Sequence, residues 1–192
     1  GEQMQFPATE QHSIAPECPY GVSKRSAELY IQYFSRIHSI PSICLRYGNV
    51  YGPRQNPKGE AGVVAIFINN LLASRPLRVN GDGLQTRDFV YVDDVAGANI
   101  AAAKTKSDNI FEIFNIGLGK ESTVLDIVES LKKHWSQIKH DDVVSVEFGP
   151  ALKGEQRRSV IDPSKASKGL NWRPEVELDK GLSNTVKSFL KK

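Results

Sequence analysis

The chain has 192 residues, of which 40% are hydrophobic and 24% are charged, and its formal net charge is +3. This composition is ordinary for a globular protein, and the length suits one sizeable domain or one and a half small ones. The small net charge argues against a nucleic-acid partner, which would require a basic stripe interleaved with aromatic residues. The positive side chains favour a small anionic ligand instead.

Metal, membrane and secretion signals are all missing from the sequence. The two cysteines, Cys18 and Cys44, and the four histidines are too scattered for metal-ligand spacing, so no metal site is predicted. No apolar run approaches the length of a membrane span, and no signal-peptide pattern is found. We therefore expect a cytoplasmic protein without a membrane or nucleic-acid partner.

The first half of the chain predicts a helix, a buried strand and a second helix. Residues 20–38 have a helical pattern, with apolar side chains at spacings of three and four: Ala27, Tyr30, Ile31 and Phe34. Pro41 stops the helix, and residues 42–52 predict a buried strand that runs into a turn. A polar loop at 53–62 leads into a helix at 62–74.

The second half predicts further alternation of strands and helices. Residues 76–92 predict a β-hairpin around an Asn-Gly-Asp-Gly turn. The elements expected after it are a helix at 93–104, an alternating strand at 111–119, a helix capped by Ser122 or Thr123, a strand at 144–149, a short helix at 163–170 and a closing helix around 182–190. Such alternation favours the α/β class.

Tyr20 and Lys24 stand four residues apart, so a helix places both side chains on one face. A free tyrosine titrates near pH 10 and is a poor base at neutral pH. Lowering its pKa by about three units costs roughly 4 kcal/mol, and one cation at about 4 Å supplies a similar amount at an effective dielectric of 20. Lys24 could be that cation and make Tyr20 a base. The same spacing also occurs in helices where the tyrosine only packs and the lysine is solvated.

Four segments carry recognisable motifs, in this order along the chain: PYGVSKRSAELY at 19–30, LRYGNVYGPRQ at 45–55, GEAGVVAIF at 59–67 and NGDGLQTRDFVYVDDV at 80–95. Together they resemble the extended short-chain dehydrogenase/reductase superfamily, most of all its UDP-glucose 4-epimerase branch. The resemblance covers nearly the whole chain. It implies an NAD-dependent enzyme that oxidises a nucleotide sugar transiently at C4 and acts as a homodimer.

The resemblance also implies a fold and a domain organisation. The chain would hold the C-terminal part of a Rossmann-like, doubly wound parallel sheet and a small α/β substrate-binding domain. Residues 1–60 would belong to the NAD-binding Rossmann domain, and residues 91–119 would return to it. Residues 61–90 and 120–192 would form the substrate-binding domain.

Individual residues acquire expected roles from the same resemblance. Tyr20 would be the catalytic base, Lys24 would lower its pKa and hold the nicotinamide ribose, and Tyr47 would contact the nicotinamide end of NAD. The residues expected to bind the nucleotide-sugar substrate are Asn49, Gly62, Val63, Arg78, Asn80 and Arg87. A guanidinium such as that of Arg87 suits phosphate oxygens.

Simpler interpretations of several of these residues stay open. Tyr47 could be a core aromatic residue, and Asn49 could only supply turn chemistry. Arg87 could form a surface ion pair with Asp88, which would contribute little. The polar side chains of Arg78 and Asn80 could simply be solvated.

The chain departs from the family pattern at the expected phosphate clamp. Family members often have a second phosphate-binding arginine two residues before a Gly-Asp or Gly-Glu pair. Leu152 holds that position before Gly154-Glu155, and Arg157 or Arg158 could replace the missing arginine. This departure weakens the expectation that the nucleotide is UDP.

The glycine-rich turn that seats the cofactor pyrophosphate is missing, as is the family's catalytic Ser or Thr, which would precede Gly1. We therefore expect the C-terminal part of a longer enzyme, inactive alone and without retained NAD, with self-association or local disorder near the first helix. Two alternatives remain: a nucleotide-sugar 4,6-dehydratase or decarboxylase of the same superfamily, or a non-catalytic sugar-nucleotide binding module.

Overall fold

The computed structural model of the chain describes residues 1–58, 62–107, 109–152 and 154–191. The described helices are α1 (Pro19–His38), α2 (Val63–Leu72), α3 (Val92–Lys104), α4 (Val124–Ser136), α5 (Ser164–Gly169) and α6 (Leu178–Leu190). The described strands are β1 (Ser42–Tyr47), β2 (Asn49–Tyr51), β3 (Leu77–Asn80), β4 (Thr86–Arg87), β5 (Phe89–Tyr91), β6 (Phe111–Ile116), β7 (Ser122–Thr123) and β8 (Val146–Gly149). The predicted α/β class is confirmed.

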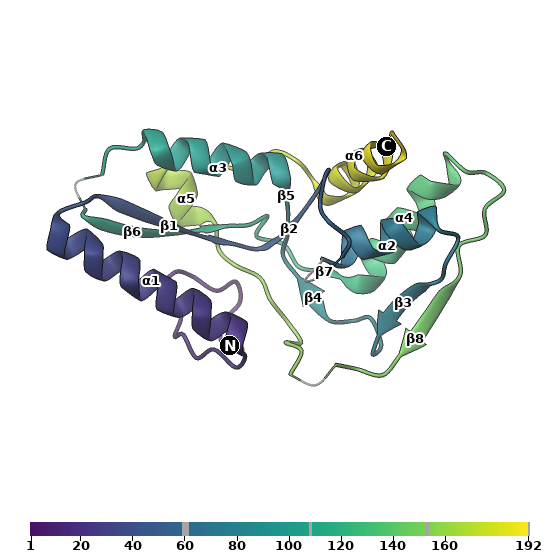
Figure 1. The fold of residues 1–192 in the computed structure, drawn as a ribbon, viewed down its shortest axis with the longest axis horizontal. Coiled ribbons are helices and arrows are strands. Elements are labelled where there is room, and N and C mark those ends of the chain that lie inside the picture. Colours follow the sequence, from purple (N-terminus) through teal and green to yellow (C-terminus); the bar gives the residue numbers. More distant parts are fainter. Residues whose placement is uncertain (59–61, 108, 153, 192) are drawn as a thin grey trace.

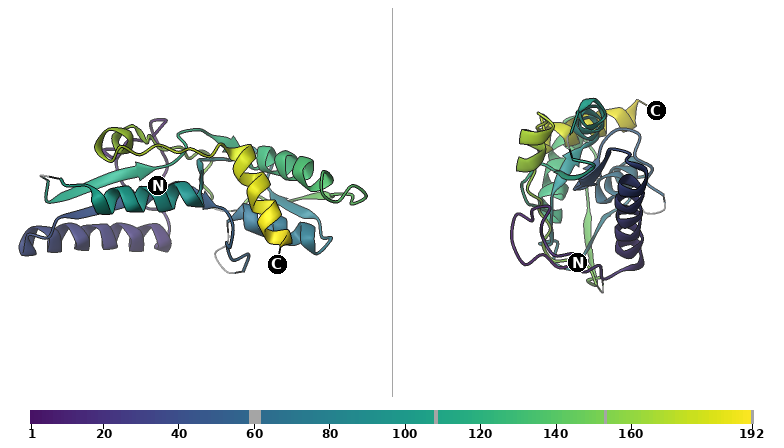
Figure 2. Two further views of the ribbon diagram at one scale, coloured as in Figure 1. Left: turned by 90° about the horizontal axis from the view of Figure 1, so that it is seen from above. Right: turned by 90° about the vertical axis from the view of Figure 1, so that its left-hand side faces the viewer.

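The molecule is elongated, with α1, β1, β6, α3 and α5 at one end and α2, α4, α6, β3 and β8 at the other (Figure 1). Strand β1 pairs in parallel with β6, β2 with β5, and β3 with β8, whereas β4 and β7 are antiparallel. The end view shows α1 and α5 on opposite sides of the β1–β6 pair (Figure 2). This end therefore has the helix–sheet–helix layering of an α/β protein.

The hairpin predicted at 76–92 is wrong. Strand β3 pairs with β8 and strand β5 pairs with β2, so the two sides of the turn have different partners. The turn itself exists, with positive φ at Gly81 and Gly83, but Asn80 has no positive φ. A two-residue hairpin turn of the Asn-Gly type needs positive φ at both central residues. Every residue of β5 is also buried, which suits an interior strand rather than a hairpin arm.

The single strand predicted at 42–52 is two strands, which are separated at Gly48. The first, β1, pairs with β6, and the second, β2, pairs with β5. The strand expected to alternate at 111–119 is also different in character. Its last three residues in β6, 114–116, are all buried, because helices cover both faces of a parallel sheet. The cap expected before α4 is confirmed: the Thr123 hydroxyl accepts from the Asp126 N–H, and the Asp126 carboxylate accepts from the Thr123 N–H.

Helix α1 forms as predicted, but its apolar side chains lie on the surface. Tyr30 is 67% exposed and Phe34 is 49% exposed, and the only buried residue of the helix is Ser35. The side of α1 that faces the sheet is polar: Gly21, Arg25, Glu28, Gln32 and Ser35. A surface helix normally buries its apolar side. In the described part of the chain, α1 instead turns its polar side to the sheet and leaves its apolar side exposed.

Two hydrophobic clusters hold the molecule together. One gathers side chains from α2, α4, α6, β3 and β5, including Phe67, Leu131 and Phe189. The other gathers side chains from α3, α5 and β6, including Phe114 and Trp172. These clusters lie at the two ends of the molecule, and the domain boundaries inferred from the resemblance stay a prediction.

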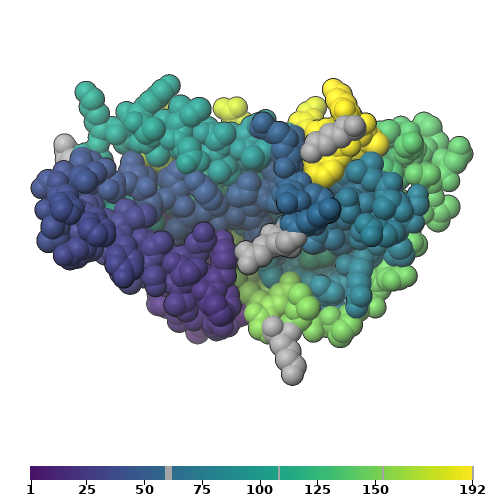
Figure 3. All heavy atoms as spheres, in the orientation of Figure 1, coloured from purple at the N-terminus to yellow at the C-terminus, as the bar shows by residue number. Residues whose placement is uncertain are grey.

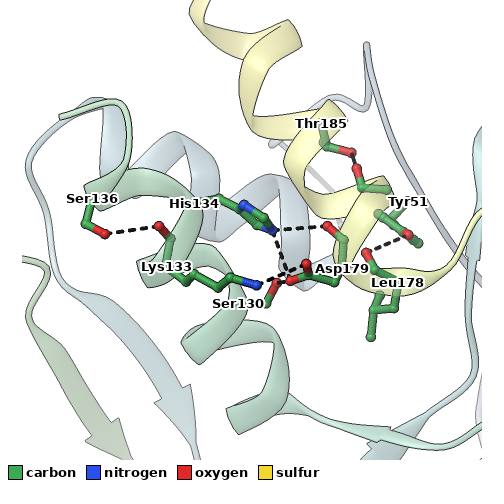
Figure 4. Close-up of polar contacts among 9 residues, drawn as sticks. Tyr51, Ser130, Lys133, His134, Ser136, Leu178, Asp179 and Thr185 are labelled. Atoms are coloured by element: carbon green, nitrogen blue, oxygen red, sulfur yellow. Dashed lines mark hydrogen bonds and ion pairs between the residues drawn. The ribbon is translucent and has the colours of Figure 1, made fainter. Parts of the chain in front are cut away.

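The first cluster is closed by polar contacts between α4 and α6 (Figure 4). Asp179 receives hydrogen bonds from the Ser130 hydroxyl at 2.7 Å and from the Lys133 ammonium at 3.2 Å. His134 Nε2 lies 3.0 Å from the Asp179 carboxylate and 3.1 Å from its carbonyl oxygen. Both partners are acceptors, so Nε2 carries the proton. These contacts hold α4 and α6 against each other.

Candidate functional site

The first two turns of α1 present Tyr20 and Lys24 on one face, as predicted. Pro19 occupies the first helical position, and the Cys18 sulfur accepts from the Gly21 N–H at 3.5 Å. Proline is favoured there because its missing N–H would be unpaired in any case. The Lys24 ammonium lies 5.3 Å from the centre of the Tyr20 ring, and both side chains are exposed. The Lys24 cation thus lies over the Tyr20 ring, and both side chains remain open to a ligand.

A pocket of about 300 Å³ lies beside this turn. Lys24 and Tyr47 both line it, together with Glu28 from the side of α1 that faces the sheet and Arg46 from β1. The Tyr47 hydroxyl donates to the Asn99 side chain at 3.1 Å, so it is tied to α3. The structure therefore brings the three residues expected at the nicotinamide end, Tyr20, Lys24 and Tyr47, to one region.

One wall of this pocket is an ion-pair network that the sequence did not reveal. The Arg46 guanidinium binds both oxygens of Glu28, at 2.7 and 2.8 Å, and Arg25 binds Glu28 from the same helix. Burial of Glu28 raises the pKa of its carboxyl, but the two arginines outweigh burial and leave that pKa below its ordinary value. The network fixes α1, and with it Lys24, against β1.

The N-terminal loop crosses the same pocket and is held by specific contacts. The Glu10 carboxylate accepts from the Asn115 N–H at 2.8 Å. His12 accepts from the Met4 N–H at Nε2, so its Nδ1 carries the proton and donates to the Ser13 carbonyl oxygen. The loop also touches the segment around residue 160, where Gln3 accepts from the Val160 N–H. Figure 3 shows these two segments side by side at the lower edge of the molecule.

Asn49 and Arg87 are brought together through Asp88. The Asn49 N–H donates to the Asp88 carbonyl oxygen at 2.6 Å. The Asp88 carboxylate is buried and accepts from the N–H groups of Leu118, Gly119 and Ile161, at 2.7, 3.0 and 3.3 Å. Burial raises the pKa of this carboxyl, against the three hydrogen bonds. Nothing in the sequence pattern indicates this role for Asp88.

Arg87 does not pair with Asp88, so that interpretation is wrong. Its guanidinium donates to the Thr86 carbonyl oxygen at 2.7 Å and to the Glu155 carboxylate at 3.1 Å. Burial lowers the pKa of Arg87, and the charge of Glu155 opposes that effect. A half-buried arginine with spare donors is suited to a phosphate group.

A second pocket, of about 250 Å³, lies at the turn after β3. Asn80, Leu152, Glu155 and Arg157 are among the side chains that line it. Arg157 binds both oxygens of Asp82 across this pocket, at 2.7 and 2.9 Å. Of the two candidates to replace the missing arginine, Arg157 lies at this pocket.

Arg158 lies elsewhere. It binds both oxygens of Glu121, at 2.8 and 2.9 Å, and stacks over the Phe6 ring at 3.9 Å. Arg78, the remaining expected residue of β3, is exposed, and its guanidinium lies against Gly149 of β8.

Gly62 and Val63 stand at the start of α2. Gly62 is the N-cap, and Val63 is the first helical residue. The loop before them includes 59–61, which lie outside the described residues, so the first part of GEAGVVAIF is not placed. The side chain of Gln55 lies against Gly62.

Neither a metal centre nor a membrane span is found within the described ranges. There, no three His, Cys, Asp or Glu side chains gather as metal ligands would. The described helices are each too short or too polar to cross a bilayer.

The sequence profile of the NAD dependent epimerase/dehydratase family matches residues 1–117. The chain belongs to this family. A UDP-glucose 4-epimerase of Mycolicibacterium smegmatis is 35% identical over 192 residues, which cover 100% of this chain and 59% of that protein. A dTDP-glucose 4,6-dehydratase of Neisseria gonorrhoeae is 31% identical over 191 residues, which cover 95% of this chain and 53% of that protein.

The family fold is confirmed by a solved structure. The UDP-glucose 4-epimerase of Thermotoga maritima, determined with UDP-glucose, superposes with a TM-score of 0.88 at 43% identity. The match covers 100% of this chain and 60% of that one. The expected Rossmann-like α/β fold is thus shown for a chain that spans about 60% of the length of such relatives.

Proposed function

We propose that this chain is the catalytic-base and substrate-binding part of an NAD-dependent UDP-hexose 4-epimerase. The observation that carries the proposal is the pairing of Tyr20 with the Lys24 ammonium on one helical turn, beside the pocket that Tyr47 lines. The two similar epimerases support the choice of reaction.

In the proposed reaction, the Lys24 ammonium stabilises Tyr20 as a phenolate, and this phenolate takes the proton from O4 of the hexose. Bound NAD would supply the acceptor and donor of the C4 hydride. The 4-keto sugar turns between these steps, and Tyr20 then gives the proton back to O4. The result is inversion at C4 without net oxidation.

The residues of this chain fit the nicotinamide end of NAD and no more. The exposed ammonium of Lys24 can donate to ribose hydroxyls, and Tyr47 borders the same pocket. The sequence lacks a glycine-rich turn for the pyrophosphate. We therefore propose that the chain alone retains no NAD and is inactive. We also propose that the longer enzyme is a cytoplasmic homodimer.

Substrate binding falls to the strand ends around Asp88. We assign the diphosphate to Arg87 and a sugar or phosphate contact to Asn49, whose N–H donates to the carbonyl oxygen of Asp88, the residue after Arg87. Gly62 and Val63 would lie along the nucleotide, and Arg78 and Asn80 would border its base. Leu152 in place of an arginine leaves the phosphates with fewer charges than is usual for the family.

A 4,6-dehydratase is the second candidate, favoured by the similar dTDP-glucose enzyme. Calorimetric titration with UDP and with dTDP separates the two: tighter binding of UDP is expected. Tighter binding of dTDP would favour the dehydratase. If neither nucleotide gave heat, the proposal that this chain binds the substrate nucleotide would be wrong. Conversion of UDP-glucose to its 4-epimer by the chain with added NAD would contradict the proposed inactivity.

A further inference from the structure

The amide of Gln55 lies between the end of β2 and the start of α2. Its Nε2 donates to the Val50 carbonyl oxygen at 3.1 Å. Its Oε1 is buried and has no hydrogen-bond donor among the described residues. An unpaired buried acceptor costs stability, so stability alone does not account for a glutamine at this position.

Gly62 is held against the same amide. A Cβ atom at position 62 would lie 2.9 Å from Gln55 Nε2, closer than real Cβ contacts allow. The backbone of Gly62 is extended, with φ −67° and ψ 149°, a conformation that any residue adopts. A methyl group at position 62 would therefore displace the Gln55 amide, the end of a flexible side chain, so glycine at this position lets the amide keep its place against the start of α2.

This contact joins two segments that the proposed function places at the substrate. Val50 follows Asn49 in β2, and Gly62 precedes Val63 at the start of α2. The carbonyl oxygen of Gly62 also accepts from the N–H groups at 65 and 66, so it starts the first turn of the helix. A shift of the Gln55 amide would thus move Asn49 relative to Val63.

We propose that Gln55 is a positioning residue of the substrate site, which sets the spacing between Asn49 and the Gly62–Val63 segment. The inference rests on the proposed function, because it assumes that both segments meet the nucleotide sugar. Gln55 acts through its neighbours: its hydrogen bond holds β2, and its bulk holds the start of α2.

The test is a double-mutant cycle read by titration with UDP. Gln55→Ala and Gly62→Ala should each weaken UDP binding about tenfold, because each disturbs the contact between the amide and its neighbours. In the Gln55→Ala background, Gly62→Ala should change binding less than about twofold, because the added methyl enters vacated space. Melting temperatures identify any variant that fails to fold.

Two controls separate positioning from general stability. Gly169→Ala also creates a collision, since its Cβ would lie 2.7 Å from the Phe114 ring, but in the other hydrophobic cluster. It should lower the melting temperature and leave UDP binding unchanged. Gln137→Ala, at an exposed glutamine after α4, should change neither quantity.

A ligand-free measurement keeps the two proposals distinct. The amide NMR signals of Asn49 and Val63 should both move in Gln55→Ala without any nucleotide. If the wild type binds UDP and the single variants bind it equally well, the positioning role is overturned and the proposed function stands. If the wild type does not bind UDP, the proposed function fails. If the Asn49 and Val63 amide signals do not move in Gln55→Ala, the positioning role is overturned.

Discussion

The Asn49 N–H donates to the Asp88 carbonyl oxygen at 2.6 Å, which joins the start of β2 to the residue before β5. Two glycines near this hydrogen bond lie so close to Asp88 that a side chain would collide with it. A Cβ at Gly48 would lie 2.7 Å from the Asp88 carbonyl oxygen, and one at Gly117 would lie 2.5 Å from its carboxylate. The glycines of the Tyr-Gly-Asn and Asn-Ile-Gly segments thus make room for Asp88.

Replacing Asp88 with Asn should destabilise the protein by roughly 1–3 kcal/mol, since an amide NH₂ group would face backbone N–H donors. The measurement is the urea unfolding midpoint. Asp93→Asn is the matched control, because Asp93 lies on the exposed side of α3. An Asp88→Asn variant as stable as the wild type would mean that the three N–H groups find other acceptors.

Replacing Glu28 with Gln should cost about 1–3 kcal/mol at pH 7, because Arg46 and Arg25 lose their shared anion. The pKa of Glu28 is lowered in the folded state, so its stabilising contribution is full above the ordinary value of 4.5. It is lost as the pH falls through the lowered folded pKa. Unfolding curves from pH 7 to pH 3 should therefore show the wild type and variant converging.

Glu129→Gln supplies the comparison for Glu28. Glu129 pairs with Lys132 at 3.0 Å on an exposed helix face. Such a pair is worth roughly 0–1 kcal/mol, so this variant should remain close to the wild type throughout the pH range. A constant difference between Glu28→Gln and the wild type down to pH 3 would show that the charge of Glu28 is not the cause.

Arg87→Met should weaken UDP binding by roughly 10- to 100-fold, because a hydrogen bond to a charged group is worth about 1.5–3 kcal/mol. Arg157→Met should also weaken it, since Arg157 lines the pocket at the turn after β3. Arg158→Met serves as the control and should bind UDP normally, because its partners are Glu121 and Phe6. Calorimetric titration with UDP measures these affinities. A larger loss of affinity in Arg158→Met than in Arg157→Met would mean that Arg158, and not Arg157, replaces the missing arginine.

The sequence predicted the element types well where a local signal exists. The cap at Thr123 and the boundaries of α3 follow from short-range chemistry. The partners of β3 and β5 could not be predicted, because each strand pairs with a segment far away in the sequence. An Asn-Gly turn signals a reversal of the chain and does not identify the strand that pairs afterwards.

The candidate site shows the same division. Tyr20 and Lys24 could be found because four residues make one helical turn. Asp88 and Gln55 could not, because their partners, the Leu118 N–H and the Val50 carbonyl oxygen, are backbone groups that leave no trace in residue type. The pairing of Arg87 with Glu155 spans 68 residues and likewise has no local signal.

The exposed apolar side of α1 should make the chain self-associate. Leu29, Tyr30 and Tyr33 border an open, mainly apolar pocket of about 420 Å³ on this helix. Contiguous apolar surface of this kind marks a contact site. Sedimentation at increasing concentration should show dimers or larger species, and Leu29→Lys combined with Tyr33→Lys should return the chain to monomer.

Val143→Lys is the control for added charge, because Val143 is 95% exposed and lies far from α1 in the sequence. It should leave self-association unchanged. Hydrogen exchange gives an independent check, since amides of an uncovered helix exchange through local opening. A monomeric wild type in which α1 is strongly protected would contradict the prediction and show that the polar contacts of Glu28 and Ser35 hold the helix unaided.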